Sequence, residues 1–167
     1  MKRILTIFLA IFISISSSAQ IQNKLLGFTL GTTTKTAVYN YYKNNHTKVI
    51  KNNDDYVVEK VKFAGQVWDY TFFSFHKGKL FSVYFNKSDF FTSLAVLDGL
   101  WEHLSTTLMN KYGDYCLNTS SEKIMFTDGK TDVSITYNYL DGHKGIGLMY
   151  TNRGLRVQKD EADDNEL

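Results

Sequence analysis

The chain has 167 residues, with 19 Lys and Arg, 17 Asp and Glu, and a single cysteine. This length suits one domain, which at about 150 residues buries roughly 70% of the surface of the unfolded chain, and the lone Cys116 excludes an intramolecular disulfide. A charge so close to balance provides no overall field that would attract nucleic acid or an anionic membrane, so we expect no nucleic-acid partner.

The N-terminus has the pattern of a secretory signal peptide. Two basic residues precede an apolar run over residues 4–15, and Ser17 and Ala19 are the small residues that a signal-peptidase site requires. We expect a signal peptide over residues 1–19 and cleavage before Gln20. Because the apolar run is shorter than the roughly 18 residues of a spanning helix, we expect an exported protein, periplasmic or secreted, with no membrane span after cleavage.

The first half of the mature chain is expected to form one helix and three strands. Thr34 is a suitable N-cap for a helix over about residues 34–44, because its hydroxyl accepts a hydrogen bond from a first-turn N–H. Three strands follow between residues 57 and 86. We expect two-residue hairpin loops at Ala64-Gly65 and Lys77-Gly78.

Two-residue loops assign every strand residue to one face of the sheet, because side chains alternate along a strand. One face is apolar except for Glu59 and is the expected core: Val57, Glu59, Val61, Phe63, Trp68, Tyr70, Phe72, Phe81, Val83 and Phe85. The opposite face is mixed: Lys60, Lys62, Asp69, Thr71, Phe73, Phe75, Leu80, Ser82 and Tyr84.

A longer helix is expected over about residues 89–112, with Ser88 as its N-cap and Gly113 as its stop. One apolar stripe recurs along it at steps of three and four, and we expect this stripe to pack on the sheet. Its residues are Phe90, Leu94, Leu97, Trp101, Leu104, Leu108 and Tyr112.

Three more strands are expected between residues 122 and 152. The Asp-Gly pairs that begin at Asp128 and Asp141 are the preferred sequences of tight hairpin turns. One face of these strands is then apolar, and the reverse face is smaller and more polar: Met125, Asp132, Ser134, Thr136, Asn138, Gly145, Gly147 and Met149.

These elements predict an α+β fold of two tandem helix-plus-three-strand units, at about residues 25–87 and 88–157. We expect a single domain over residues 20–157, with one antiparallel sheet and the helices packed on one face. Residues 158–167 carry one Lys and five acidic residues and are expected to be a disordered acidic tail.

Few residues match a catalytic or metal-binding motif. The four histidines and the cysteine do not occur at metal-ligand spacing, so we expect no metal and no cofactor. Asp69 and Asp132 both fall on the faces that the helices are expected to leave open. They are candidates for an acid/base pair, although carboxylates on strands more often keep a surface soluble.

The open face of the first three strands is the main candidate for a binding surface. Phe73, Phe75 and Tyr84 are expected to be partly exposed there among polar residues. Aromatic side chains interleaved with charges are typical of protein-binding surfaces. The candidate binding residues are Lys60, Lys62, Asp69, Thr71, Phe73, Phe75 and Tyr84. Coverage of these residues by a third layer or by a second copy of the chain is the alternative.

The helix-and-strand order also resembles a known fold. The segments LGFTLG at residues 26–31, KYG at 111–113 and GLMYTN at 147–152 are similar to those of the β-lactamase inhibitory protein-like fold. That resemblance implies tandem α/β repeats, a curved antiparallel sheet with helices on one side, and protein binding through the concave face. The signal sequence ending in Ser-Ala-Gln is similar to those of small exported Bacteroidetes proteins. The paired cysteines of the inhibitor are absent, so inhibitor activity is not implied.

Three hypotheses about function follow. The first is an exported, non-catalytic module that binds a protein of the cell envelope or exterior through the open sheet face. The second is a binder or hydrolase of a small molecule or glycan at Asp69 and Asp132. The third is a structural subunit that forms a homodimer and buries Phe73 and Phe75.

Overall fold

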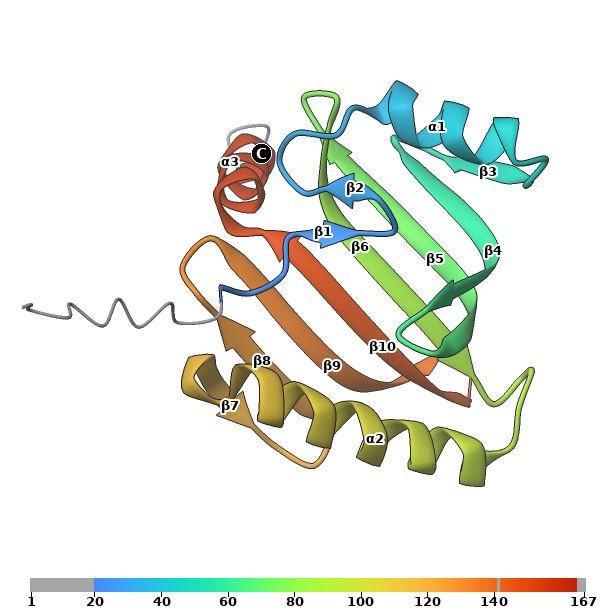
Figure 1. Ribbon diagram of the computed structural model, residues 1–167, viewed down its shortest axis with the longest axis vertical. Coiled ribbons are helices and arrows are strands. Elements are labelled where there is room, and N and C mark those ends of the chain that lie inside the picture. Colours follow the sequence, from blue (N-terminus) through green and yellow to red (C-terminus); the bar gives the residue numbers. More distant parts are fainter. Residues whose placement is uncertain (1–19, 141, 165–167) are drawn as a thin grey trace, which may run out of the picture.

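The computed structural model describes residues 20–140 and 142–164, and the predicted signal peptide lies outside them. Within these residues the chain is an α+β protein with three α-helices and a large antiparallel sheet (Figure 1). The helices are α1 (Lys35–Asn44), α2 (Leu94–Tyr112) and α3 (Arg153–Asp164). The sheet strands are β3 (Val49–Asn52), β4 (Asp55–Phe63), β5 (Gln66–His76), β6 (Lys79–Ser88), β7 (Cys116–Thr119), β8 (Lys123–Thr127), β9 (Thr131–Leu140) and β10 (His143–Asn152).

The eight strands lie in the order β3-β4-β5-β6-β10-β9-β8-β7. Both α1 and α2 are followed by four consecutive strands, and the two sets meet where β6 pairs with β10. The expected units of one helix and three strands are therefore not confirmed, because β3 and β7 add a strand at each edge. A separate hairpin of β1 (Lys24–Leu25) and β2 (Phe28–Thr29) precedes α1.

Turn chemistry sets the strand connections. Ala64 and Gly65 both have positive φ, as do Lys77 and Gly78, which is the geometry of a two-residue type I′ hairpin turn. The predicted turn at Asp128-Gly129 is wrong. The Asp128 N–H donates to the Thr131 carbonyl, so the loop is one residue further along the chain. This moves the β8–β9 register by two residues, which leaves the predicted faces of these strands unchanged.

The core lies between one face of the sheet and a layer made of α1, α2 and the β1–β2 hairpin. Figure 1 shows α1 and α2 toward opposite margins of the sheet, with the hairpin between them. Leu97, Leu104 and Leu108 of α2 are buried, as the apolar stripe predicted, whereas Leu94 is exposed. Val83 and Phe85 contribute buried side chains from the middle of the sheet.

Helix α2 begins at Leu94, five residues later than the predicted start. Its N-cap is Ser93, whose hydroxyl accepts a hydrogen bond from the Val96 N–H. Ser88 cannot cap this helix because it still belongs to β6, where its N–H donates to the Asp69 carboxylate. Residues 89–93 therefore form a loop between the sheet and the helix.

A polar cluster and a ring stack hold α2 on the sheet. Asp98 of α2 accepts hydrogen bonds from the Tyr137 hydroxyl at 2.8 Å and from the Lys144 ammonium at 3.0 Å. Both hydrogen bonds lower the pKa of Asp98, and the bond from Lys144 has the larger effect. The Trp101 ring stacks on Tyr137 at 4.5 Å between centroids. The N-terminal half of α2 is thus tied to β9 and β10.

The predicted faces of β5 are wrong for most of its length because β6 contains a bulge. Ser74 pairs with Ser82 and Phe75 pairs with Leu80, so Phe81 has no partner in β5. One extra residue turns every later side chain of β6 to the other face relative to β5. Phe73, rather than Phe72, therefore pairs with Val83 and shares its buried face.

A second irregularity lies in β4, and beyond it, toward the turn of the β4–β5 hairpin, the buried face is again the predicted one. Lys60 has a φ of +55°, in the left-handed region that bulky residues rarely adopt. Val58 before Lys60 and Val61 after it both belong to the core. Because these two residues are three positions apart, they break the alternation of side chains along β4. Trp68, opposite Val61, is fully buried in the core as predicted.

The acidic tail also differs from the prediction. Residues 158–164, expected to be disordered, form the greater part of α3, which contacts β5, β6 and β10. Ion pairs between Arg156 and Asp160 and between Lys159 and Asp163 link successive turns of this helix.

Candidate functional site

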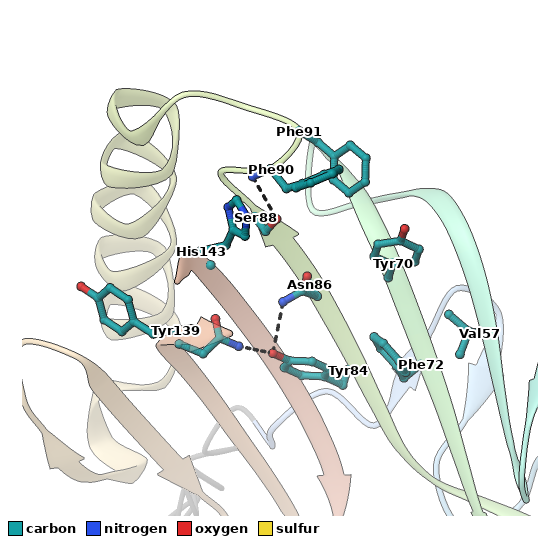
Figure 2. Close-up of a pocket in the computed structure, with 12 residues that line it drawn as sticks. Val57, Tyr70, Phe72, Tyr84, Asn86, Ser88, Phe90, Phe91, Tyr139 and His143 are labelled. Atoms are coloured by element: carbon teal, nitrogen blue, oxygen red, sulfur yellow. Dashed lines mark hydrogen bonds between the residues drawn. The ribbon is translucent and has the colours of Figure 1, made fainter. Parts of the chain in front are cut away.

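The sheet face opposite the core holds a cavity of about 810 Å³, which we call the cup (Figure 2). Its side chains come from β4, β5, β6, β9 and β10 and from the loop before α2. The cup is lined by Val57, Tyr70, Phe72, Tyr84, Asn86, Ser88, Phe90, Phe91, Asn138, Tyr139, His143 and Gly145. Phe72 and Tyr84 alternate along their strands with the buried Phe73 and Phe85, which places the cup on the reverse of the core-facing side.

Two glycines of β10 leave the space in which the cup forms. A Cβ atom at Gly147 would overlap with the ring of Tyr84. A Cβ atom at Gly145 would lie 2.8 Å from Asn138 Oδ1 and 3.2 Å from the Lys87 carbonyl. Because β10 carries no side chain at these positions, Tyr84 and Asn138 from the neighbouring strands lie close to its backbone.

One side of the cup is polar. The Tyr84 hydroxyl accepts a hydrogen bond from Asn86 Nδ2 at 3.4 Å and another from Asn138 Nδ2 (Figure 2). The side-chain oxygen of Asn138 is buried and has no hydrogen-bond partner within the described residues. An unmatched buried acceptor is uncommon, since it has lost its water without gaining a donor.

The other side of the cup is apolar and aromatic. Val57 is buried but lies outside the main core cluster, and Phe72 packs against Tyr84 with 5.7 Å between ring centroids. The ring of Tyr70 contacts Phe91 edge to face at 6.0 Å. Figure 2 shows Val57, Tyr70 and Phe72 grouped on the side away from His143.

The loop over residues 89–93 is fixed to β10 and places two phenylalanines at the rim. The Asp89 N–H donates to the Lys144 carbonyl, and the Asp89 carboxylate accepts from the Lys144 N–H. The same carboxylate lies 2.9 Å from His143 Nδ1. Phe90, which is 67% exposed, contacts the His143 ring, and Phe91 lies under the Lys60 ammonium.

Tyr84 is the one predicted binding residue that lines the cup. Thr71, Phe73 and Phe75 are buried on the core face, so their expected exposure is wrong. The bulge in β6 is the cause, because it exchanges the two faces of β5. A homodimer cannot bury Phe73 and Phe75, since the chain's own core already covers them.

The charged candidates also lie outside the cup. Lys60 and Lys62 are exposed, whereas Asp69 is only 3% exposed. Asp69 accepts hydrogen bonds from the Lys60 ammonium at 2.8 Å and from the Ser88 N–H at 3.2 Å. These partners give Asp69 a structural role at the base of the β4–β5 hairpin.

Asp69 and Asp132 do not form a pair. The strand registers place them three strands and five residues apart, which corresponds to roughly 20 Å. Asp132 instead accepts a hydrogen bond from Thr127 and lies 3.8 Å from Arg153. The acid/base arrangement expected from the sequence is therefore not present.

Most residues of the cup were not candidates in the sequence. Tyr70 and Phe72 were assigned to the core, and Phe90 was assigned to the apolar stripe of the helix. The strand glycines Gly145 and Gly147 were the available signal, because glycine inside a strand marks a bend or a close approach of other groups.

No group of three or more potential metal ligands occurs in the part of the chain that the structure describes. In that same part, no helix is long and apolar enough to cross a membrane. The sequence matches no protein-family model, and comparisons with curated proteins and with solved structures give no match.

Proposed function

We propose that this protein is an exported, non-catalytic binding module that holds a small molecule in the cup. The observation that supports this function is a cavity of about 810 Å³ with aromatic sides and a few convergent polar groups. Ligand sites in proteins are concave, have volumes of about 300–1,000 Å³ and combine apolar surface with a small number of polar groups.

The burial of Phe73 and Phe75 favours a small molecule over a protein partner. The protein-binding surface predicted from the sequence required both rings to be exposed, but both lie in the core. The aromatic residues left on the open face surround a hollow of small-molecule size. Asp69 and Asp132 are far apart, which supports binding rather than hydrolysis at these carboxylates.

Export and a doubled architecture remain part of the proposal. The basic and apolar N-terminal residues support a signal peptide. The presence of four strands after each of α1 and α2 supports two tandem units, and the open face of the sheet is consistent with the resemblance to the β-lactamase inhibitory protein-like fold.

A variant with a filled cup tests the function. We expect the mature protein to increase the fluorescence of the neutral probe N-phenyl-1-naphthylamine, because the probe would leave water for an aromatic site. Val57→Trp places a larger side chain in the cup and should raise the Kd of the probe at least about tenfold. Val67→Trp is the matched control, since Val67 is 47% exposed and does not line the cup.

Thermal melts of both variants separate loss of the site from loss of the fold. Equal probe affinity in the parent, Val57→Trp and Val67→Trp proteins would place the probe elsewhere and contradict the function. If Val57→Trp does not fold, Phe72→Ala provides the second measurement. This variant widens the cup and should change the Kd of the probe. It leaves the core beneath the β1–β2 hairpin unaltered, because Phe72 lies outside the core cluster.

A protein partner is the second candidate, and exposed aromatic residues at the rim favour it. Phe90, Phe91 and Tyr139 line the cup and are 67%, 48% and 66% exposed. Exposed aromatic side chains are frequent anchors of protein interfaces. The double variant Phe90→Asp and Tyr139→Asp should then release a partner identified by cross-linking, whereas Leu117→Asp on β7 should retain it. Retention by the double variant would argue against this candidate.

A further inference from the structure

We infer that the ligand of the cup is uncharged, with a compact apolar ring system at one end and a hydroxyl group at the other. This inference rests on the proposed small-molecule function and specifies its ligand class. It follows from the separation of the lining into an apolar side on β4 and β5 and a polar side on β6, β9 and β10.

The polar side has one donor and one acceptor that the described residues leave unmatched. The Tyr84 oxygen receives hydrogen bonds from Asn86 and Asn138, but no described group accepts the proton of the Tyr84 hydroxyl. Asn138 Oδ1 is buried without a donor. A ligand hydroxyl both accepts and donates, so a single hydroxyl can accept from Tyr84 and can donate to Asn138 Oδ1 once the amide turns this oxygen toward the cup.

The apolar side suits a ring. Val57, Tyr70 and Phe72 present aliphatic and aromatic surface, and Phe91 closes this side from the loop. Aromatic rings attract one another in offset or edge-to-face arrangements beyond the gain from burial. A fused or substituted ring is therefore favoured at this end of the cup.

The charges around the cup disfavour an ionised ligand. Among the described residues that line it there is no Asp, Glu, Lys or Arg. The Lys60 ammonium, which lies over the Phe91 ring, is already bound to Asp69, and the His143 ring nitrogen Nδ1 is bound to Asp89. An ionised ligand would lose its hydration without gaining a free counter-charge.

A free sugar also fits poorly. Its hydroxyl groups extend in all directions, and several would face Val57 and Phe72. Hydroxyls buried against these side chains would have no partners, which weakens binding. A molecule with separate apolar and polar ends avoids this loss.

Three naphthalene compounds test the inference on the mature protein. We expect 2-naphthol to bind about tenfold more tightly than naphthalene, the difference that one buried hydrogen bond provides. We expect 2-naphthalenesulfonate to bind more weakly than both, and N-acetylglucosamine to give no thermal shift. Fluorescence titration gives the Kd for each naphthyl compound.

Tyr84→Phe assigns the preference to the polar side of the cup. It should remove the advantage of 2-naphthol and leave the Kd of naphthalene unchanged, whereas Tyr41→Phe, at an exposed tyrosine of α1 that does not line the cup, should alter neither. Asn138→Leu is the second variant and should reduce the same advantage.

The possible outcomes distinguish this inference from the function on which it rests. Equal Kd values for the three naphthyl compounds, or a preference for the sulfonate, would overturn the ligand class while leaving small-molecule binding in place. Binding of none of these compounds or of N-phenyl-1-naphthylamine would overturn both. A preference for 2-naphthol that persists in Tyr84→Phe and Asn138→Leu would move the hydroxyl site elsewhere and overturn the inference.

Discussion

The aromatic ring of Tyr84 lies against the backbone of Gly147 on the neighbouring strand. A Cβ atom at Gly147 would lie 2.6 Å from the Tyr84 hydroxyl oxygen and 2.8 Å from the adjacent ring carbon. Only glycine fits beneath the ring in this position. The hydroxyl that forms the polar side of the cup is therefore placed by the absence of a side chain on β10.

Gly147→Ala should displace the Tyr84 ring into the cup and weaken probe binding. The overlap involves a ring that is itself held by two amides, so we expect a loss of about 1–3 kcal/mol in the free energy of unfolding, as is common for overpacking. Urea unfolding and a titration with N-phenyl-1-naphthylamine measure the two effects. Gly99→Ala is the matched control, because a Cβ atom at this exposed position of α2 meets nothing within 4 Å.

The Gly99→Ala control should change stability in the opposite direction. Alanine replaces glycine inside a helix at Gly99, so the free energy of unfolding should rise by about 0.5–1 kcal/mol, with no change in probe binding. An equally stable Gly147→Ala protein with parental probe affinity would show that Tyr84 does not depend on this contact.

The two tryptophans should differ in their contribution to stability. Trp68 is fully buried and donates a hydrogen bond from its ring nitrogen to the Phe63 carbonyl. Trp68→Ala should therefore lower the free energy of unfolding by about 3–5 kcal/mol. Trp101 is half-buried and stacks on Tyr137, so Trp101→Ala should cost less. Chemical denaturation measures both, and a larger loss for Trp101→Ala would be inconsistent with the observed core.

Stability should fall at alkaline pH because two buried tyrosines resist ionisation. Burial first, and then the neighbouring Tyr41, raises the pKa of Tyr42 well above its ordinary value of 10.0, and burial with Tyr112 does the same for Tyr150. Above pH 10 the unfolded chain therefore releases protons that the folded chain retains. The stabilisation present below pH 10 is then lost by about 1.4 kcal/mol per pH unit for each tyrosine.

Urea unfolding between pH 9 and pH 11.5 measures this slope. Tyr42→Phe and Tyr150→Phe remove the ionisable hydroxyl and should each make the decline shallower. A Tyr41→Phe control should change the slope less, since Tyr41 is 49% exposed. Parallel pH profiles for the parent and the Tyr42→Phe and Tyr150→Phe proteins would contradict the prediction.

Asp69 and Lys60 should contribute unequally although they form one ion pair. The Asp69 side chain is 3% exposed and also accepts from the Ser88 N–H, whereas the Lys60 side chain is 59% exposed. Asp69→Ala should cost about 1–3 kcal/mol because it leaves a backbone donor without a partner. Lys60→Met should cost less than about 1 kcal/mol, as exposed ion pairs usually do. Equal losses in thermal or urea unfolding would indicate that the pair itself supplies the stability.

Local patterns in the sequence predicted six of the sheet strands, the first helix with its Thr34 cap, and the α+β class. Each of these depends on residues close in the chain, such as the Ala64-Gly65 and Lys77-Gly78 turns. The reverse face of β10 was also predicted to be small and polar, and Gly145 and Gly147 lie there. No strand was predicted at β3, because it lies in a segment rich in Asn, Asp and Lys between the first helix and the first predicted strand.

The tertiary structure decided which aromatic residues face the core. Phe72 and Phe73 are adjacent, and alternation along β5 permits either to be buried. The unpaired Phe81 and the left-handed Lys60 settle the choice, and both irregularities depend on pairing with other strands. The cup likewise unites residues of β4, β6, β9 and β10 that are up to 88 positions apart in the chain, from Val57 to Gly145. Such contacts form only when the whole sheet assembles, so no local pattern specifies them.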